Sequence, residues 1–138
     1  MAVEARQKHL VLILAREFAS RLATPMLVAD EQGNLVFYNE PAEEVIGRSF
    51  AEAGEMPASE WGSLFQIEDL DGNAIPLERL PVSIALFQRR PAQATVRFVA
   101  LNGRRRVAVV NAFPLFARVG ELSGVVLIFW EEPAPAAS

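Results

Sequence analysis

The order of apolar and polar positions divides the chain into segments with helical and extended periods. Residues 2–22 carry an apolar side chain at most spacings of three or four, which is the period of an amphipathic helix. Leu12 and Ile13 widen this stripe beyond what packing on one sheet requires, so we expect the helix to lie between a sheet and a second chain. Pro25 ends the helix, because the residue before a proline avoids helical backbone angles. The stripe consists of Val3, Leu10, Val11, Leu14, Phe18 and Leu22.

The rest of the chain carries the signals of short helices and of strands joined by tight turns. Asn39 is a favourable N-cap for the helix that follows it, and Gly47 is a favourable C-cap. Asn102 and Gly103 form the strongest hairpin signal in the sequence. Strands are therefore expected over residues 26–30, 35–38, 93–101, 104–116 and 122–131, and helices over 40–46, 50–53, 59–65 and 77–88. This order predicts an α+β fold with one antiparallel sheet of about five strands and short helices on one face.

The two long C-terminal strands are apolar at both odd and even positions. A sheet with one face in water alternates apolar and polar residues, whereas a sheet covered on both faces does not. We therefore expect the short helices to cover one face and the N-terminal helix, or a second chain, to cover the other. The expected boundaries are an N-terminal helix over residues 1–23, a domain over 24–131 and a disordered tail over 132–138.

Composition limits the chemistry that this chain can perform. Its 138 residues, of which 51% are hydrophobic and 22% charged, suit one globular domain. With no cysteine it has no disulfide, thiolate metal site or cysteine nucleophile, and its one histidine, His9, disfavours histidine-based metal sites. The net charge of −4 provides no basic excess for binding nucleic acid. No apolar run is long enough to span a membrane and no signal peptide is evident, so we expect a cytoplasmic protein.

Charge is distributed unevenly along the chain. Residues 30–78 contain twelve acidic side chains against a single arginine, whereas residues 79–106 contain seven arginines and no acid. Two solvated faces of one domain explain this distribution, and a docking surface for a charged partner is the alternative. The run Arg104-Arg105-Arg106 has the same two interpretations, namely a solvated strand edge or a contact with phosphate or an acidic partner.

Several segments, in their order, carry a resemblance to a known family. Residues 26–39, Met-Leu-Val-Ala-Asp-Glu-Gln-Gly-Asn-Leu-Val-Phe-Tyr-Asn, resemble the opening of a PAS domain, and residues 40–49 resemble the short helix that follows it. The stretch from Asp71-Gly72 to Pro81, followed by a helix and a three-strand meander, is similar to PAS modules of bacterial sensor kinases and phosphatase regulators. The resemblance covers about residues 24–131. It implies a sensing or protein-interaction module, and many PAS domains dimerise through an N-terminal helix.

The resemblance also limits the cofactor. The blue-light branch of the family attaches a flavin through a cysteine, and the haem branch ligates iron through a histidine on the helix before the meander. This chain has no cysteine and no histidine in residues 77–88, which disfavours a covalent flavin and a histidine-ligated haem. No cofactor is therefore predicted, and an apolar small molecule such as a fatty acid is the ligand that a pocket would suit.

The family pattern places such a pocket between the concave face of the sheet and the short helices. Ala108 and Ala112 are small residues that face large helical ones, which favours a cavity, while an ordinary packed core is the alternative. The polar candidates to orient a head group are Asn39, Asn111 and Trp61. The candidate pocket residues are Leu27, Ala29, Asn39, Ile46, Trp61, Phe65, Ile84, Phe87, Val96, Phe98, Ala108, Val110, Ala112, Val126 and Ile128.

The broad helical stripe and the two-sided apolar sheet predict a homodimer. A two-fold interface between each N-terminal helix, its mate and the outer sheet face would bury both apolar surfaces at once. The expected interface residues are Val3, Leu10, Ile13, Leu14 and Phe18 of the helix and Val109, Phe113, Leu127 and Phe129 of the sheet. A signalling protein, such as a kinase, phosphatase or regulator, is the expected further partner.

A second hypothesis is a carrier or an enzyme that uses the same cupped sheet. Glu68, Asp69 or Asp71 would then supply the acid–base group, because paired carboxylates can do such work. The alternative is that these acids serve the Asp71-Gly72-Asn73 turn beside them. A pocket carboxylate with a perturbed pKa would favour the enzyme, and an entirely apolar pocket would favour the sensor.

Overall fold

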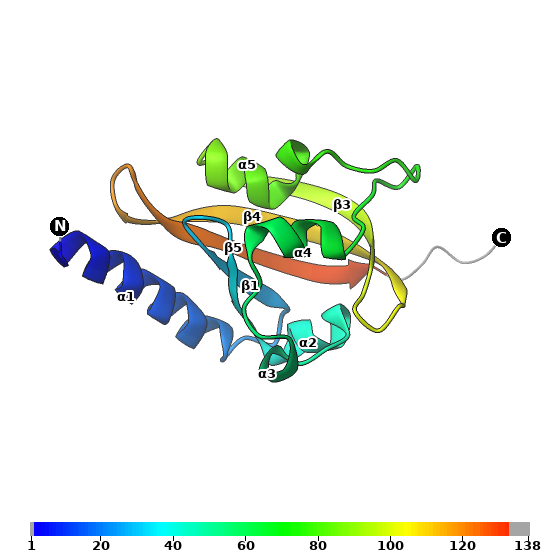
Figure 1. Cartoon of the computed structure of the whole chain (residues 1–138), viewed down its shortest axis with the longest axis horizontal. Helices are drawn as coiled ribbons and strands as arrows, with labels where there is room; N and C mark the ends of the chain where they lie inside the picture. Colours follow the sequence, from blue (N-terminus) through cyan, green and yellow to red (C-terminus); the bar gives the residue numbers. More distant parts are fainter. Residues whose placement is uncertain (1, 133–138) are drawn as a thin grey trace.

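The structure is a computed structural model that describes residues 2–132, and for residues 2–9 and 62 it describes the backbone only (Figure 1). The predicted contact side chain of Val3 and residues 133–138 of the predicted tail at 132–138 lie outside the described parts, whereas Glu132 ends the last strand. The elements are α1 (Ala2–Ala19), β1 (Met26–Asp30), β2 (Leu35–Tyr38), α2 (Glu40–Ile46), α3 (Phe50–Ala53), α4 (Ala58–Leu64), the 3₁₀ helix η1 (Leu77–Arg79), α5 (Pro81–Phe87), β3 (Ala92–Val99), β4 (Arg105–Arg118) and β5 (Glu121–Glu132).

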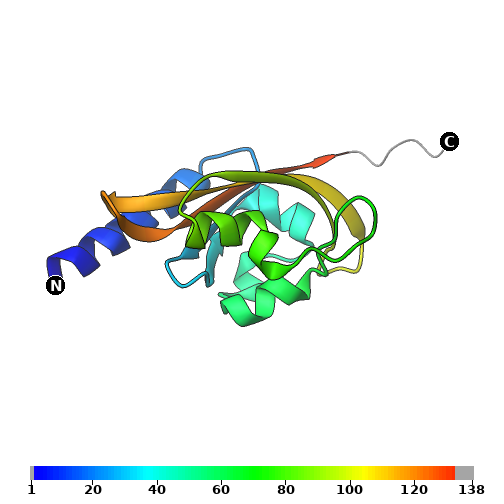
Figure 2. The ribbon, with the colours of Figure 1, turned by 90° about the horizontal axis from the view of Figure 1, so that it is seen from above.

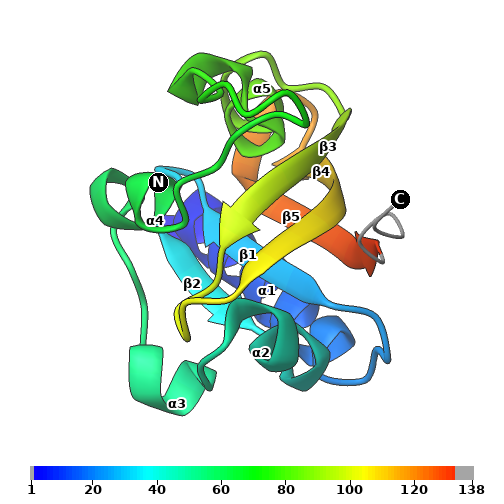
Figure 3. The ribbon, with the colours of Figure 1, turned by 90° about the vertical axis from the view of Figure 1, so that its right-hand side faces the viewer.

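The strands form one antiparallel sheet in the order β2-β1-β5-β4-β3 (Figures 1 and 3). Tight turns join β3, β4 and β5 into the predicted meander, and β1 pairs with β5. The last strand of the chain therefore lies at the centre of the sheet. Short helices pack on this sheet, which confirms the predicted α+β fold.

Local sequence explains why α2 begins and ends where it does. The Asn39 side chain accepts a hydrogen bond from the Ala42 N–H at 3.1 Å, which satisfies one of the free donors at the helix start. At the other end Gly47 has φ +91°, a left-handed conformation that glycine adopts without steric cost. The observed bounds are the predicted ones.

The single helix predicted over residues 77–88 is wrong, because the chain breaks it at Leu80. Leu80 is extended, with φ −64° and ψ 142°, so η1 ends there and α5 begins at Pro81. Proline suits the first position of a helix but disfavours helical angles in the residue before it. Pro81 therefore divides the segment into two helices.

Helices cover both faces of the sheet (Figure 2). The short helices α2 to α5 pack on one face, called here the inner face, and the core formed with them is the larger one. On the other, outer face, a second cluster lies under α1. The N-terminal residues that pack into this second cluster are Leu12, Ala15, Ala19 and Leu22.

The predicted assignment of β5 residues to the two faces is wrong. Leu127 and Phe129, expected on the outer face, lie in the inner core, where each is 6% exposed. Val126 and Ile128, expected in the pocket, pack in the outer cluster beside α1. Every residue in this stretch is apolar, so no alternation in the sequence distinguishes the two sides.

Pairing with β4 decides the faces of β5. Residues opposite each other in an antiparallel pair share a face, and Leu127 lies opposite Ala112 while Phe129 lies opposite Val110. The register shifts twice between Leu115 and Arg118, close to the turn that joins the two strands. Counting residues from that turn therefore does not predict which side of β5 faces the core.

Candidate functional site

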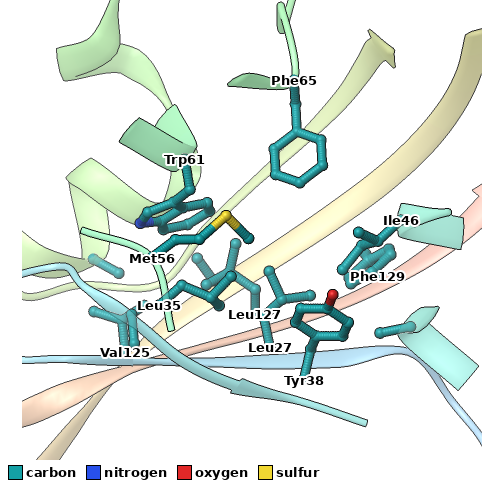
Figure 4. Packing of buried hydrophobic residues seen from close by; sticks show 14 of the residues in the cluster. Leu27, Leu35, Tyr38, Ile46, Met56, Trp61, Phe65, Val125, Leu127 and Phe129 are labelled. Carbon is teal, nitrogen blue, oxygen red and sulfur yellow. The ribbon is translucent and has the colours of Figure 1, made fainter. Parts of the chain in front are cut away.

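The inner core contains a small cavity between the sheet and the short helices. In Figure 4 Leu27 of β1 and Leu127 of β5 point up from the sheet toward Trp61 of α4 and Phe65 beyond it. The cavity has a volume of about 80 Å³, and its surface is apolar throughout. It is lined by Leu27, Ile46, Trp61, Phe65, Ile67, Val96, Phe98, Ala108, Val110, Leu127 and Phe129.

The structure brings about half of the predicted pocket residues together. Those that line the cavity are Leu27, Ile46, Trp61, Phe65, Val96, Phe98, Ala108 and Val110. Ala29 and Ala112 lie in the same core but do not border the cavity. Ile84 is half-buried outside it, and Phe87 is 76% exposed at the end of α5. Both helical residues were expected to face the sheet, but the residues that α5 buries are Pro81, Ser83, Ala85 and Leu86.

Three lining residues are absent from the predicted set, namely Ile67, Leu127 and Phe129. The two β5 residues were assigned to the wrong face. Ile67 lies in an irregular segment, and its place follows from its neighbour Glu68, whose N–H donates to the Arg97 carbonyl at 2.9 Å. No local sequence pattern reports such a long-range contact.

Asn39 binds backbone groups and does not border the cavity, contrary to the prediction. Its Oδ1 accepts from the N–H groups of Met26 and Ala42 at 3.0 and 3.1 Å. Its Nδ2 donates to the carbonyls of Ala19 and Thr24, at 2.9 Å each. This buried amide therefore joins the end of α1 to β1 and α2, and its hydrogen bonds are not free for a ligand.

The other two predicted head-group residues also use their polar atoms elsewhere. The Asn111 Oδ1 accepts from the Gln93 Nε2 at 2.9 Å. The Trp61 Nε1 donates to the Gly33 carbonyl at 2.8 Å, although the ring lines the cavity. The lining consequently offers apolar contacts to whatever occupies it.

The cavity wall formed by α4 is attached to the β1–β2 turn. Besides the Trp61 bond, the Asn34 Oδ1 accepts from the Ala58 N–H at 3.0 Å. Met56 and Leu35 exchange two backbone hydrogen bonds of 2.8 and 3.0 Å. These contacts hold α4 at its N-terminal side and along its length.

The size of the cavity limits its contents. Drug-sized ligands occupy pockets of about 300–1,000 Å³, and an apolar cavity of about 150 Å³ holds benzene. A volume of about 80 Å³ admits only a few heavy atoms. A larger ligand therefore either extends out of this space or displaces its wall. Among the described residues, no group of three histidine or acidic side chains is placed to hold a metal ion.

The predicted interface residues of α1 are exposed on this chain. Leu10, Ile13, Leu14 and Phe18 are each between 54% and 59% exposed, and they form what we call the α1 stripe. On the sheet, Phe113 packs in the outer cluster as expected. Val109 alternates with the inward-facing Ala108 and Val110 and so also lies on the outer face.

The carboxylates of the enzyme hypothesis lie away from the cavity. Asp69 Oδ1 accepts from the N–H groups of Asp71 and Asn73 at 2.9 and 3.0 Å, which is the turn role expected of a short acid there. Glu68 pairs through its backbone with Arg97. None of these acids lines the cavity, so the structure offers no acid–base group at that place.

Comparisons with known proteins agree with this architecture. A family model described as a PAS fold matches residues 20–131. A PAS domain from Colwellia psychrerythraea is similar with a TM-score of 0.63 and 16% identity, over 88% of this chain and 97% of that one. The PAS domain of Bordetella pertussis BvgS has a TM-score of 0.57 and 18% identity, over 91% of this chain and 88% of that one. The Rhodobacter sphaeroides LOV protein has a TM-score of 0.67 and 15% identity, over 91% of this chain and 67% of that one.

No curated protein sequence matches the chain. In residues 2–132 no helix has both the length and the apolar character needed to cross a membrane. The family match extends over most of the chain. The five-stranded sheet of this chain, with short helices on its inner face, is the fold of the similar structures. This chain belongs to the PAS family, whose members are sensory and signalling modules.

Proposed function

We propose that this protein is a bacterial, cytoplasmic sensor module that binds a small apolar ligand in the inner cavity and homodimerises through α1. The observation that carries the proposal is a cavity without polar lining in the core of a PAS fold. An apolar lining favours binding without chemistry, because no acid or base borders the space. A kinase, phosphatase or other regulator is the partner that we expect downstream.

The strand β5 connects the proposed ligand to the proposed dimer. Leu127 and Phe129 line the cavity. Val126 and Ile128, which alternate with them along β5, pack in the cluster under α1. A ligand that displaces the inward-facing pair therefore also moves the outward-facing pair. Packed interfaces respond to such shifts by adopting a second arrangement rather than by deforming continuously.

The α1 stripe supports the dimer. Its four apolar residues are more than half exposed on the single chain, although α1 buries a different set of side chains against the sheet. A second copy would remove this surface from water in a symmetric contact. The interface would thus lie on the same helix that β5 contacts from below.

Mass spectrometry after denaturing extraction tests the ligand directly. We expect the purified protein to release an apolar molecule in near-stoichiometric amount, and Ala108→Phe to release much less because the ring fills the cavity. The matched control is Val119→Ser, an exposed position on the β4–β5 turn. An empty extract, together with no binding of short-chain fatty acids or of benzene, would contradict the ligand proposal.

Sedimentation tests the dimer independently. We expect the intact chain to be dimeric at about tens of micromolar, and the double variant Ile13→Ser, Phe18→Ser to be monomeric with the far-UV circular dichroism of the folded wild type. Val119→Ser should remain dimeric. A monomeric wild type, or a double variant that still dimerises, would show that the α1 stripe is not the interface.

A further inference from the structure

A second concave site lies at the ends of β3, β4 and β5. In Figure 1 these strand ends lie on the side of the molecule away from the start of α1. Its volume of about 530 Å³ falls in the range of about 300–1,000 Å³ that is usual for small-molecule sites. Four of its lining residues are arginines and three are glutamates. We call this site the arginine groove; it contains the Arg104-Arg105-Arg106 run that the cavity does not use.

One of the four arginines is already neutralised. The Arg106 Nε lies 3.2 Å from the Glu131 Oε2, and its Nη1 donates to the Glu44 carbonyl at 3.1 Å. The Arg106 side chain is only 12% exposed. This residue therefore closes the end of the inner core and adds little free charge to the groove.

The other three arginines are available to a ligand. Arg97, Arg104 and Arg105 are exposed. Within the part of the chain whose side chains are described, none of the three forms an ion pair or a side-chain hydrogen bond. Their guanidinium groups therefore line the groove without a close carboxylate partner among the described side chains, although Glu68, Glu131 and Glu132 line it too.

Sheet register brings two of these arginines together. Arg97 lies opposite Val107, and Arg105 lies opposite Val99, so the two arginines are diagonal neighbours on adjacent strands. Diagonal neighbours are separated by about 7–8 Å, within reach of long side chains. An anion placed between two cationic side chains at this separation is attracted by both.

The glutamates of the groove limit the size of that anion. Glu68, Arg97, Val107 and Glu132 form one row across neighbouring strands, with a carboxylate at each end. A long polyanion such as a nucleic-acid strand would meet these two carboxylates. A compact anion between Arg97 and Arg105 would have only Glu68, the cross-strand neighbour of Arg97, close to it.

We propose that the arginine groove binds a phosphate group through Arg97 and Arg105, with Arg104 reaching it from the β3–β4 turn. A phosphate carries close to two negative charges and three acceptor oxygens, so it can engage two guanidinium groups at once. A carboxylate carries one charge and suits a single guanidinium group. The ligand class is thus a small phosphate ester or a phosphorylated side chain, and the site is separate from the apolar cavity.

Titration of the full chain with pyrophosphate at constant ionic strength, followed by NMR of the backbone amides, tests this site. We expect saturable shifts confined to residues 97–99 and 104–107. The double variant Arg97→Gln, Arg105→Gln should bind pyrophosphate at least about tenfold more weakly than the wild type. Glu132→Gln should bind more tightly, because it removes a repelling carboxylate from the end of the row. Arg79→Gln, an exposed arginine outside the groove, is the matched control and should not change the affinity.

Two results would overturn the proposal: shifts that never saturate at millimolar pyrophosphate, or equal affinity in the wild type and the double arginine variant. Weaker binding of pyrophosphate by Glu132→Gln would also contradict the proposed arrangement.

A phosphoserine peptide distinguishes the source of the phosphate. Tighter binding of the peptide than of pyrophosphate assigns the groove to a phosphorylated protein segment, and the reverse order assigns it to a small phosphorylated molecule; either order supports the site.

Discussion

The inner face of the sheet is closed by short helices that all come from one stretch of chain, whereas the outer face is covered by the single helix α1. Inner-face residues such as Trp61 and Phe65 are 6% and 5% exposed. On the outer side Trp130 is 43% exposed, and the α1 stripe is still more open. The two faces are nevertheless similarly apolar in sequence. An apolar pattern therefore indicates that a surface is to be covered, but not whether the same chain covers it.

The largest expected effect separates the two faces by stability. Trp61→Ala removes a buried ring and its hydrogen bond to Gly33, and it should lower the free energy of unfolding by about 3–5 kcal/mol. Phe18→Ala, on the exposed α1 stripe, should cost less than about 0.5 kcal/mol. Urea denaturation at a concentration where the chain is monomeric measures both. Equal losses would show that α1 is as tightly packed as the inner wall.

Gly124 is a test of how closely α1 and β1 approach β5. A Cβ at this position would meet the Ala29 carbonyl oxygen and lie 2.8 Å from the Leu12 Cδ2. Gly124→Ala should therefore cost about 1–3 kcal/mol, since the Ala29 backbone in the paired strand cannot move away as the end of the Leu12 side chain can. Ser123→Ala is the control, because the buried Ser123 hydroxyl has no hydrogen-bond partner among the described residues and its loss should be neutral or stabilising. Thermal unfolding that ranks the two variants the other way would contradict this packing.

A matched pair of alanines on β4 distinguishes a cavity from a packed core. Ala108 and Ala112 share a strand and a face and are 0% and 1% exposed, but only Ala108 lines the cavity. Ala112→Val should overpack the core and cost about 1–3 kcal/mol. Ala108→Val can place its extra methyl groups in the empty volume and should change the unfolding free energy by less than about 0.5 kcal/mol. Similar losses for both would mean that no usable space exists beside Ala108.

The effect expected to be smallest near neutral pH, where it vanishes, is a pH dependence of the inner core. Burial, followed by the charge of Glu43, raises the pKa of Tyr38 from 10.0 to about 12. The unfolded chain then loses this proton at lower pH than the folded chain, so stability is fully present below pH 10 and falls as pH rises through about 12. Unfolding measured in this window should show the decline in the wild type and a smaller one in Tyr38→Phe. An identical decline in both would assign it to other groups.

Local sequence determined much of the architecture. A capping side chain at Asn39 and a left-handed glycine at Gly47 set the bounds of α2, because caps act within one helical turn. The order of short strands, helices and meander was sufficient to indicate a PAS fold. Eight cavity residues were predicted correctly because they lie on elements whose inward positions follow from the family pattern.

Tertiary structure decided what those local signals leave open. From Val125 to Phe129 every side chain is apolar, so the face of each one depends on the pairing of β5 with β4 and on the irregular register near Leu115. Ile67 reaches the cavity because its neighbour Glu68 pairs with Arg97 of β3, a strand that is distant in sequence. Local patterns carry the period of an element and the chemistry of its ends, whereas register and long-range pairing arise only when distant segments compete for the same hydrogen bonds and the same core volume.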